Sequence, residues 1–127
     1  MRLLLDTHTV IWYIRDDPHL PGHIRQMIKD DSNIIYVSVV SLWEISIKSR
    51  QGKLELHKSL NDVVHLLRGN GFRFLTIRLN HVSRLDTLES HHKDPFDRML
   101  IAQSLAGSFA LVGCDEMFDR YGVRRLW

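Results

Sequence analysis

The sequence lacks the features that mark secreted and membrane proteins. Cys114 is the only cysteine among 127 residues, so no intramolecular disulfide can form, which is typical of a protein in a reducing cytosol. No apolar run is long enough to cross a membrane. The acid Asp6 comes too early for the apolar segment of a signal peptide. We therefore expect a cytoplasmic protein without a membrane span.

Several catalytic signatures are also missing. The chain has no phosphate-binding glycine-rich loop and no G-x-S-x-G motif, which excludes the common nucleotide-binding and hydrolase forms of an α/β fold. No expected helix carries two histidines four residues apart, so no zinc site is predicted. The adjacent His91 and His92 lie in a polar connector, where neighbouring histidines rarely bind one ion together. No lysine follows the apolar stretch 109–112, as a phosphoacceptor domain would require.

The sequence has little excess of positive over negative charge, since its net charge is +2. This value alone does not predict nucleic-acid binding. Residues 68–84 nevertheless carry four arginines and no acid, and residues 48–58 carry four basic residues with one acid. These stretches are either solvated surface or a basic rim for phosphates around an acidic centre.

Apolar stretches of strand type alternate with stretches of helical type along the chain. The expected strands cover residues 2–5, 34–37, 72–77, 109–112 and 123–126. The expected helices cover residues 9–15, 21–29, 39–50, 60–68, 80–88, 95–106 and 115–121. This alternation predicts a single α/β domain over residues 1–127, with a central parallel sheet of about five strands flanked by helices.

Polar residues mark most of the expected helix starts. Ser38 is a candidate N-cap, Ser59 with Asp62 three residues later resembles a capping box, and Asn80 is a candidate cap for the helix at 80–88. Asp94 precedes Pro95, and proline is favoured at the first helical position. Trp12, Trp43 and Trp127 are interpreted as core or interface residues.

Four acids are the candidate functional residues. Asp6 follows the first strand, Asp115 follows the fourth, Asp97 lies in the first turn of a helix, and Glu44 is the only acid between Ile34 and Ile47. In an open α/β sheet, residues just beyond the strand ends gather at one edge, where ligands bind. Close carboxylates repel by roughly 4 kcal/mol per pair at an effective dielectric of about 20. A hard divalent cation would compensate this repulsion.

Each acid also has a structural interpretation. Asp6 and Asp115 are possible helix N-caps, although Thr7 or Thr9 could cap the first helix instead of Asp6. Glu44 is either an exposed partner of Lys48 one turn later or a half-buried carboxylate facing another partner. For the helix at 95–106 we interpret Asp94 as the cap and Asp97 as the ligand.

Four segments of the sequence resemble PIN domains, and among them the VapC-type toxins of bacterial toxin–antitoxin pairs. They span the chain in the family's order, and the segment around Asp97 is the most specific. The segments are Leu4–His8, Ser41–Lys48, His92–Gln103, and Cys114–Asp115 together with Phe118–Asp119, Tyr121–Val123 and Leu126–Trp127. One position departs from the family, because Gly113 stands where a threonine or serine is usual two residues before the last acid.

The resemblance implies a PIN-like three-layer fold and hydrolysis of RNA phosphodiesters with Mg²⁺ or Mn²⁺. It places the metal-binding and catalytic acids at Asp6, Glu44, Asp97 and Asp115. We assign Asp6 and Asp97 as principal ligands. Glu44 ligates directly, ligates through water, or orients the nucleophile, and Asp115 ligates the same or a second ion. The basic residues Arg98 and Lys48 contact phosphate or are surface residues.

The resemblance also implies partners. These are an RNA substrate, a cognate antitoxin that blocks the acidic pocket, and a second copy of the chain in a homodimer. The helix containing residues 10–14 is apolar on nearly every side, so it lines the antitoxin groove or the dimer interface, or is buried within the monomer. The alternative to a nuclease is a PIN-fold module that binds RNA or protein without cutting, for which Gly113 is a weak argument.

Overall fold

The computed structural model describes residues 1–127. Its elements follow the order β1 (Arg2–Leu5), α1 (Thr7–Ile14), α2 (Gly22–Lys29), β2 (Ile34–Ser38), α3 (Val39–Arg50), α4 (Leu60–Gly69), β3 (Arg73–Leu75), α5 (Leu79–Asp86), α6 (Pro95–Gly107), β4 (Ala110–Val112), the 3₁₀ helix η1 (Glu116–Tyr121) and β5 (Arg124–Leu126). No helix has the length and apolar character needed to cross a membrane. The order of elements agrees with the prediction from the sequence.

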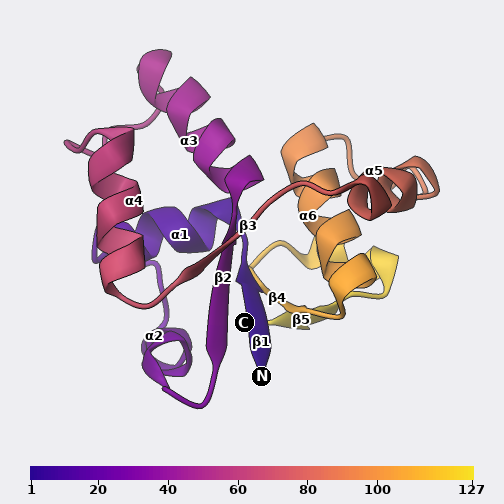
Figure 1. The fold of residues 1–127 in the computed structure, drawn as a ribbon, viewed down its shortest axis with the longest axis horizontal. Coiled ribbons are helices and arrows are strands. Elements are labelled where there is room, and N and C mark those ends of the chain that lie inside the picture. The colour runs from indigo at the N-terminus through magenta and orange to yellow at the C-terminus, as the bar shows by residue number, and fades with distance from the viewer.

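A five-stranded sheet in the order β3-β2-β1-β4-β5 forms the middle layer, and all its strand pairs are parallel. Helices α1 to α4 lie on one side of the sheet and α5 and α6 on the other (Figure 1). This confirms the predicted three-layer α/β fold. Strand β1 occupies the centre, so helices cover it on both faces.

The apolar run of β1 is explained by this central position. Leu3, Leu4 and Leu5 are each fully buried. Leu3 and Leu5 belong to the hydrophobic cluster that also contains residues of α1, α2 and α4, whereas Leu4 belongs to the cluster that contains residues of α6. Successive side chains of a strand point to opposite faces, so a strand covered on both faces is apolar throughout.

Several helix starts confirm the expected caps. The Ser38 hydroxyl accepts a hydrogen bond from Val40 N, and Asp94 Oδ1 accepts hydrogen bonds from Phe96 N and Asp97 N. Ser59 and Asp62 form the predicted reciprocal capping box.

Several boundaries differ from the prediction. Helix α1 begins at Thr7 because Asp6 caps it, and strand β3 is limited to Arg73–Leu75. Asn80 is not a cap, because α5 already begins at Leu79. The His81 ring accepts a hydrogen bond from Arg78 N there, and histidine is not a residue that marks a helix start in a sequence.

The aromatic and apolar residues of α1 are largely used within the monomer. Val10, Ile11 and Ile14 are buried, and Trp12 packs partly buried against the same cluster and against Trp127, with ring centroids 5.8 Å apart. Trp43 differs, since it is 59% exposed and lies outside the core.

Candidate metal centre

Parallel strands bring their carboxyl ends to one edge of the sheet, and the predicted acids gather there. Asp6 directly follows β1, and Asp115 follows β4 as the N-cap of η1. Glu44 comes from α3 and Asp97 from the first turn of α6, two helices that contact each other. Burial is the main reason that the pKa values of Asp97 and Asp6 are raised; Asp6 and Glu44 add smaller contributions at Asp97, and Asp115 adds one at Asp6. Each of the four acids therefore lies near at least one of the other three.

Asp6 serves the helix and the cluster at once. Its Oδ1 accepts hydrogen bonds from Thr9 N at 2.8 Å and from Thr9 Oγ1 at 2.7 Å, so Asp6, not Thr7 or Thr9, is the N-cap of α1. Its pKa is nevertheless raised, mainly because burial disfavours the charged form and also because Asp115 is near. The cap leaves Oδ2 without a hydrogen bond from Thr9.

Glu44 is buried, with 3% of its surface exposed. Its Oε2 lies 2.5 Å from Lys48 Nζ, so the expected pair one helical turn apart exists, but the carboxylate is inside. Its Oε1 is buried without any hydrogen-bond partner. An orphaned buried carboxylate oxygen is costly, and a cation is the kind of partner that would satisfy it.

The pKa of Asp97 is also raised. Burial, followed by the charge of Asp94, raises the pKa of Asp97 to about 7, against a lowering effect of His92. Asp94 caps α6 as the sequence predicted, and the Asp97 carboxylate lies beside His92. A carboxyl with such a pKa indicates a site where negative charge is crowded.

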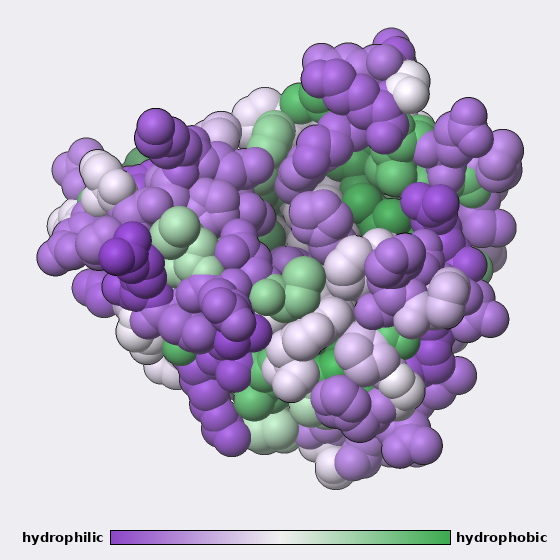
Figure 2. All heavy atoms as spheres, turned by 180° about the vertical axis from the view of Figure 1, so that it is seen from behind, coloured by the Kyte–Doolittle hydropathy of each residue, from purple (hydrophilic) through white to green (hydrophobic).

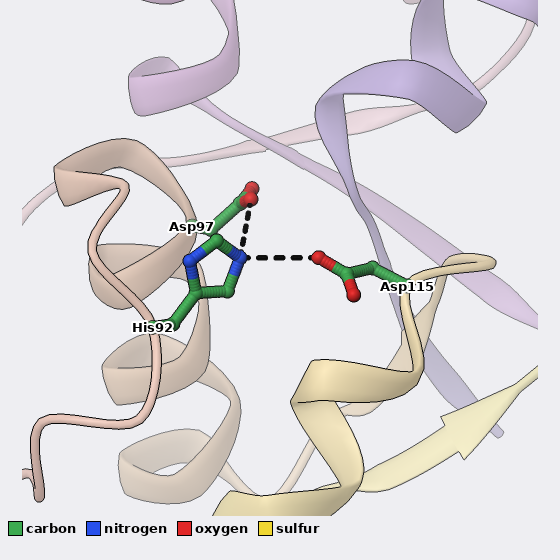
Figure 3. A group of neighbouring side chains, drawn as sticks. All are labelled: His92, Asp97 and Asp115. Atoms are coloured by element: carbon green, nitrogen blue, oxygen red, sulfur yellow. Dashed lines mark hydrogen bonds and ion pairs between the residues drawn. The ribbon is translucent and has the colours of Figure 1, made fainter.

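His92 is the residue that the sequence interpretation missed. Its Nε2 lies 3.0 Å from Asp97 Oδ2 and 3.1 Å from Asp115 Oδ2, so the ring joins the two acids (Figure 3). One ligand atom from each of the three residues lies within 4.8 Å of the others, a spacing suited to a metal ion. The neighbouring His91 pairs instead with Glu89 at 2.8 Å. The position of His92 directly before the Lys93-Asp94 cap was the available signal, because it places the ring near the first turn of α6.

Arg98, expected at a phosphate or on the surface, is engaged by the loop before α6. Its Nη1 donates to Glu89 O at 2.8 Å, to His92 O at 3.3 Å and to the Tyr121 hydroxyl at 3.2 Å. These contacts hold the segment that carries His92. Lys48, by contrast, keeps 37% of its side chain exposed while pairing with Glu44.

Gly113 leaves the space that Asp6 occupies. A Cβ at this position would lie 2.6 Å from Asp6 Oδ2 and 3.2 Å from the Phe118 ring. The absence of a hydroxyl residue at Gly113 therefore allows this Asp6 position and removes none of the four carboxylates.

The donor set fits a hard divalent cation. Asp97 and Asp115 each offer a carboxylate oxygen within 4.8 Å of the other and of a His92 nitrogen, and the buried Glu44 carboxylate has an unpartnered oxygen. Oxygen ligands suit Mg²⁺ and Mn²⁺, and Mg²⁺ retains several waters, so a few carboxylates are sufficient. A cation among these groups would also favour ionised Asp6 and Asp97, whose pKa values burial raises.

Comparison with known proteins gives a family and a set of similar folds. Residues 3–124 match the family described as PIN domain. No curated protein matches the sequence significantly.

Solved structures of similar fold include complexes from three bacteria. VapBC2 of Rickettsia felis, bound to a DNA fragment from its promoter, matches with a TM-score of 0.76 at 14% identity, covering 99% of this chain and 98% of that chain. DNA-bound VapBC of Salmonella typhimurium matches with a TM-score of 0.74 at 18% identity, covering 99% of this chain and 97% of that chain. FitAcB of Neisseria gonorrhoeae matches with a TM-score of 0.70 at 18% identity, covering 98% of this chain and 96% of that chain. At these identities the matches show the shared fold.

Proposed function

The chain belongs to the PIN domain family, and from this premise we propose that it is a metal-dependent endoribonuclease, with residues 1–127 forming one catalytic domain. The observation that carries the proposal is the unpartnered, buried Oε1 of Glu44 within the acidic cluster. The raised pKa values of Asp6 and Asp97 support it, because crowded carboxylates are a cost that a bound cation compensates.

We assign Asp6 and Asp97 as the principal ligands of Mg²⁺ or Mn²⁺. Asp115 ligates the same or a second ion, and Glu44 ligates directly, ligates through water, or orients the attacking water. When bound, such an ion lowers the pKa of a coordinated water and neutralises charge that develops on the phosphate.

The residues around the acids have separate tasks. Asp94 caps α6 and so fixes the first turn that carries Asp97. Lys48 holds Oε2 of Glu44, which leaves Oε1 for the site. Of the two basic residues expected at the phosphate, Lys48 retains the exposed surface to contact it, whereas Arg98 donates to carbonyls of its own loop.

We further propose that the chain is a VapC-type toxin that acts in the cytoplasm and forms a homodimer. The similar solved structures include complexes named VapBC, which supports a small antitoxin as the partner of this chain. Figure 2 shows hydrophobic side chains recessed between hydrophilic ones on one face of the molecule. An antitoxin segment that folds on binding can bury apolar residues in such a recess and place a cation among the acids.

Cleavage of RNA by the purified chain tests the chemistry. We expect hydrolysis of single-stranded or structured RNA with Mg²⁺ or Mn²⁺ and none with excess EDTA. The triple variant Asp6→Asn, Glu44→Gln, Asp97→Asn should retain its fold by circular dichroism and lose cleavage. Cleavage at the wild-type rate by this variant would refute the nuclease assignment, and RNA binding without cleavage by the wild type would favour the binding module.

The toxin role is tested separately. Expression of the chain should arrest bacterial growth, and co-expression of the protein encoded next to it should restore growth. If expression is harmless without that neighbour, the toxin role fails even where cleavage in vitro is observed.

A further inference from the structure

The His92 ring contacts the same oxygens that the proposed cation would need. Its Nε2 lies 3.0 Å from Asp97 Oδ2 and 3.1 Å from Asp115 Oδ2 (Figure 3). These acids come from α6 and from the start of η1, which are far apart in the chain. The ring is therefore the direct link between two carboxylates of the cluster.

The other ring nitrogen identifies which atom carries the proton. His92 Nδ1 lies 3.2 Å from Asp94 N and accepts the hydrogen bond of that amide. An accepting Nδ1 has no hydrogen, and an imidazole carries at least one, so the hydrogen is on Nε2. Nε2–H consequently donates to Asp115 Oδ2 and lies at ion-pair distance from Asp97 Oδ2, and Nε2 has no lone pair for a metal while this arrangement holds.

The loop around His92 fixes the ring in this position. The Tyr121 hydroxyl accepts hydrogen bonds from His92 N at 2.7 Å and His91 N at 2.9 Å, and it donates to Glu89 O at 2.9 Å. The ring also packs near Phe118, with centroids 6.1 Å apart, and 15% of the side chain is exposed. The contact with the acids is thus supported by backbone and packing interactions from η1.

We propose that His92 is a positioning residue that bridges Asp97 and Asp115, with Nε2–H donating to Asp115 and in contact with Asp97, and that it withdraws from both when a divalent cation binds. The inference rests on the proposed function, since it takes the four acids as the metal site. The bridge keeps the two carboxylates, which have oxygens within 4.8 Å of each other, close together despite their mutual repulsion. Because a donor hydrogen and a cation compete for the same oxygens, the bridge also weakens cation binding.

Mg²⁺ titration of a matched pair of variants tests the competition. His92→Phe keeps an aromatic ring beside Phe118 and removes the donor, whereas His91→Phe makes the same change in the adjacent residue, whose ring pairs with Glu89. By calorimetry on the full chain, His92→Phe should bind Mg²⁺ about tenfold more tightly than wild type, the factor expected when a hydrogen bond to a charged group no longer has to be broken. His91→Phe should bind Mg²⁺ as wild type does.

Nitrogen NMR of the wild type tests the bridge even if His92→Phe fails to fold. Long-range ¹H–¹⁵N spectra without cation should show His92 as the Nε2–H tautomer, and saturating Mg²⁺ should shift its ring signals. An Nδ1–H tautomer of His92 without cation would overturn the inference, and so would His92 ring signals whose chemical shifts stay the same when Mg²⁺ binds.

The failures of the two proposals can be told apart. Weaker Mg²⁺ binding by His92→Phe, together with a ¹⁴N coupling in the electron spin echo spectrum of bound Mn²⁺, would make His92 a ligand and overturn the withdrawal alone. Unchanged Mg²⁺ affinity in His92→Phe would overturn the competition alone. Absence of Mg²⁺ binding in every protein, wild type included, would refute the metal site itself and the withdrawal with it.

Discussion

Helices α4 and α6 begin with the same local pattern, a capping residue followed three positions later by an aspartate, yet the two aspartates have different surroundings. In α4, Asp62 Oδ2 accepts a hydrogen bond from Ser59 N at 3.3 Å, and Ser59 Oγ accepts one from Asp62 N at 3.1 Å. In α6, Asp94 Oδ1 accepts the hydrogen bonds of both Phe96 N and Asp97 N, and the Asp97 carboxylate takes no part in capping but faces His92.

The comparison shows what distinguishes a capping acid from a site acid. Asp62 is exposed and its contacts are with its own helix. Asp97 is partly buried next to Asp94, Asp6 and Glu44, and its pKa is raised to about 7. Asp94 belongs to the same helix start, but Asp6 and Glu44 come from other elements of the fold, so the same local pattern leads to a structural role in one helix and to the candidate site in the other.

The largest expected difference between the two aspartates is in catalysis. Asp97→Asn should lower the rate of Mg²⁺-dependent RNA cleavage by about 100-fold or more, because it removes a proposed ligand and even outer-shell changes at metal sites cost about 10–100-fold. Asp62→Asn should leave the rate near that of wild type. Initial rates on one RNA substrate measure both, and equal losses in the two variants would contradict the distinction.

Mg²⁺ should also distinguish them in stability. A ligand that binds only the folded state at 100 times its Kd stabilises it by about 2.7 kcal/mol, so saturating Mg²⁺ should raise the Tm of wild type and of Asp62→Asn. The Tm of Asp97→Asn should change little. A full Mg²⁺ shift in Asp97→Asn would exclude this residue as a principal ligand.

The raised pKa of Asp97 predicts a pH-dependent difference in EDTA. The folded pKa of about 7 lies above the ordinary value of 3.8, so the folded state retains a proton that the unfolded state releases. This contribution to stability is complete below pH 4 and is lost as the pH rises through 7. Asp97→Asn carries no such group, so its Tm relative to wild type should increase by several degrees from pH 5 to pH 8.

Differential scanning fluorimetry at a series of pH values measures this difference. Asp62→Asn serves as the control and should show no comparable trend relative to wild type. A Tm difference between Asp97→Asn and wild type that stays constant from pH 5 to pH 8 would show that Asp97 ionises normally.

The smallest effect concerns the capping residue of α4. Ser59→Ala removes the acceptor for Asp62 N and should lower the free energy of unfolding by about 1 kcal/mol. Mg²⁺ affinity should stay unchanged, because the capping box lies outside the acidic cluster. Urea denaturation measures the first quantity and calorimetry the second, and a loss of Mg²⁺ binding would mean that the two helix starts are coupled.

Much of the fold was predictable because it depends on residues close together in the chain. Alternating apolar stretches predicted the order of strands and helices, and Ser38, Ser59 and Asp94 predicted helix starts that the structure confirms. Helix α5 lies close to where it was predicted, but Asn80 is not its cap, because its start uses the ring of His81 and not a typical capping side chain. The four acids were found because parallel strands bring their carboxyl ends to one edge.

The chain's local pattern thus determined the three-layer fold and the acids that meet at its edge. Tertiary contacts decided the rest. Glu44 is buried with one oxygen unpartnered, and Asp6 occupies the space beside Gly113. His92 contacts both Asp97 and Asp115, and Asp115 lies 23 residues after His92 in the chain. Burial and pKa depend on what other elements place around a side chain. Those neighbours are distant in sequence, so no local pattern contains them.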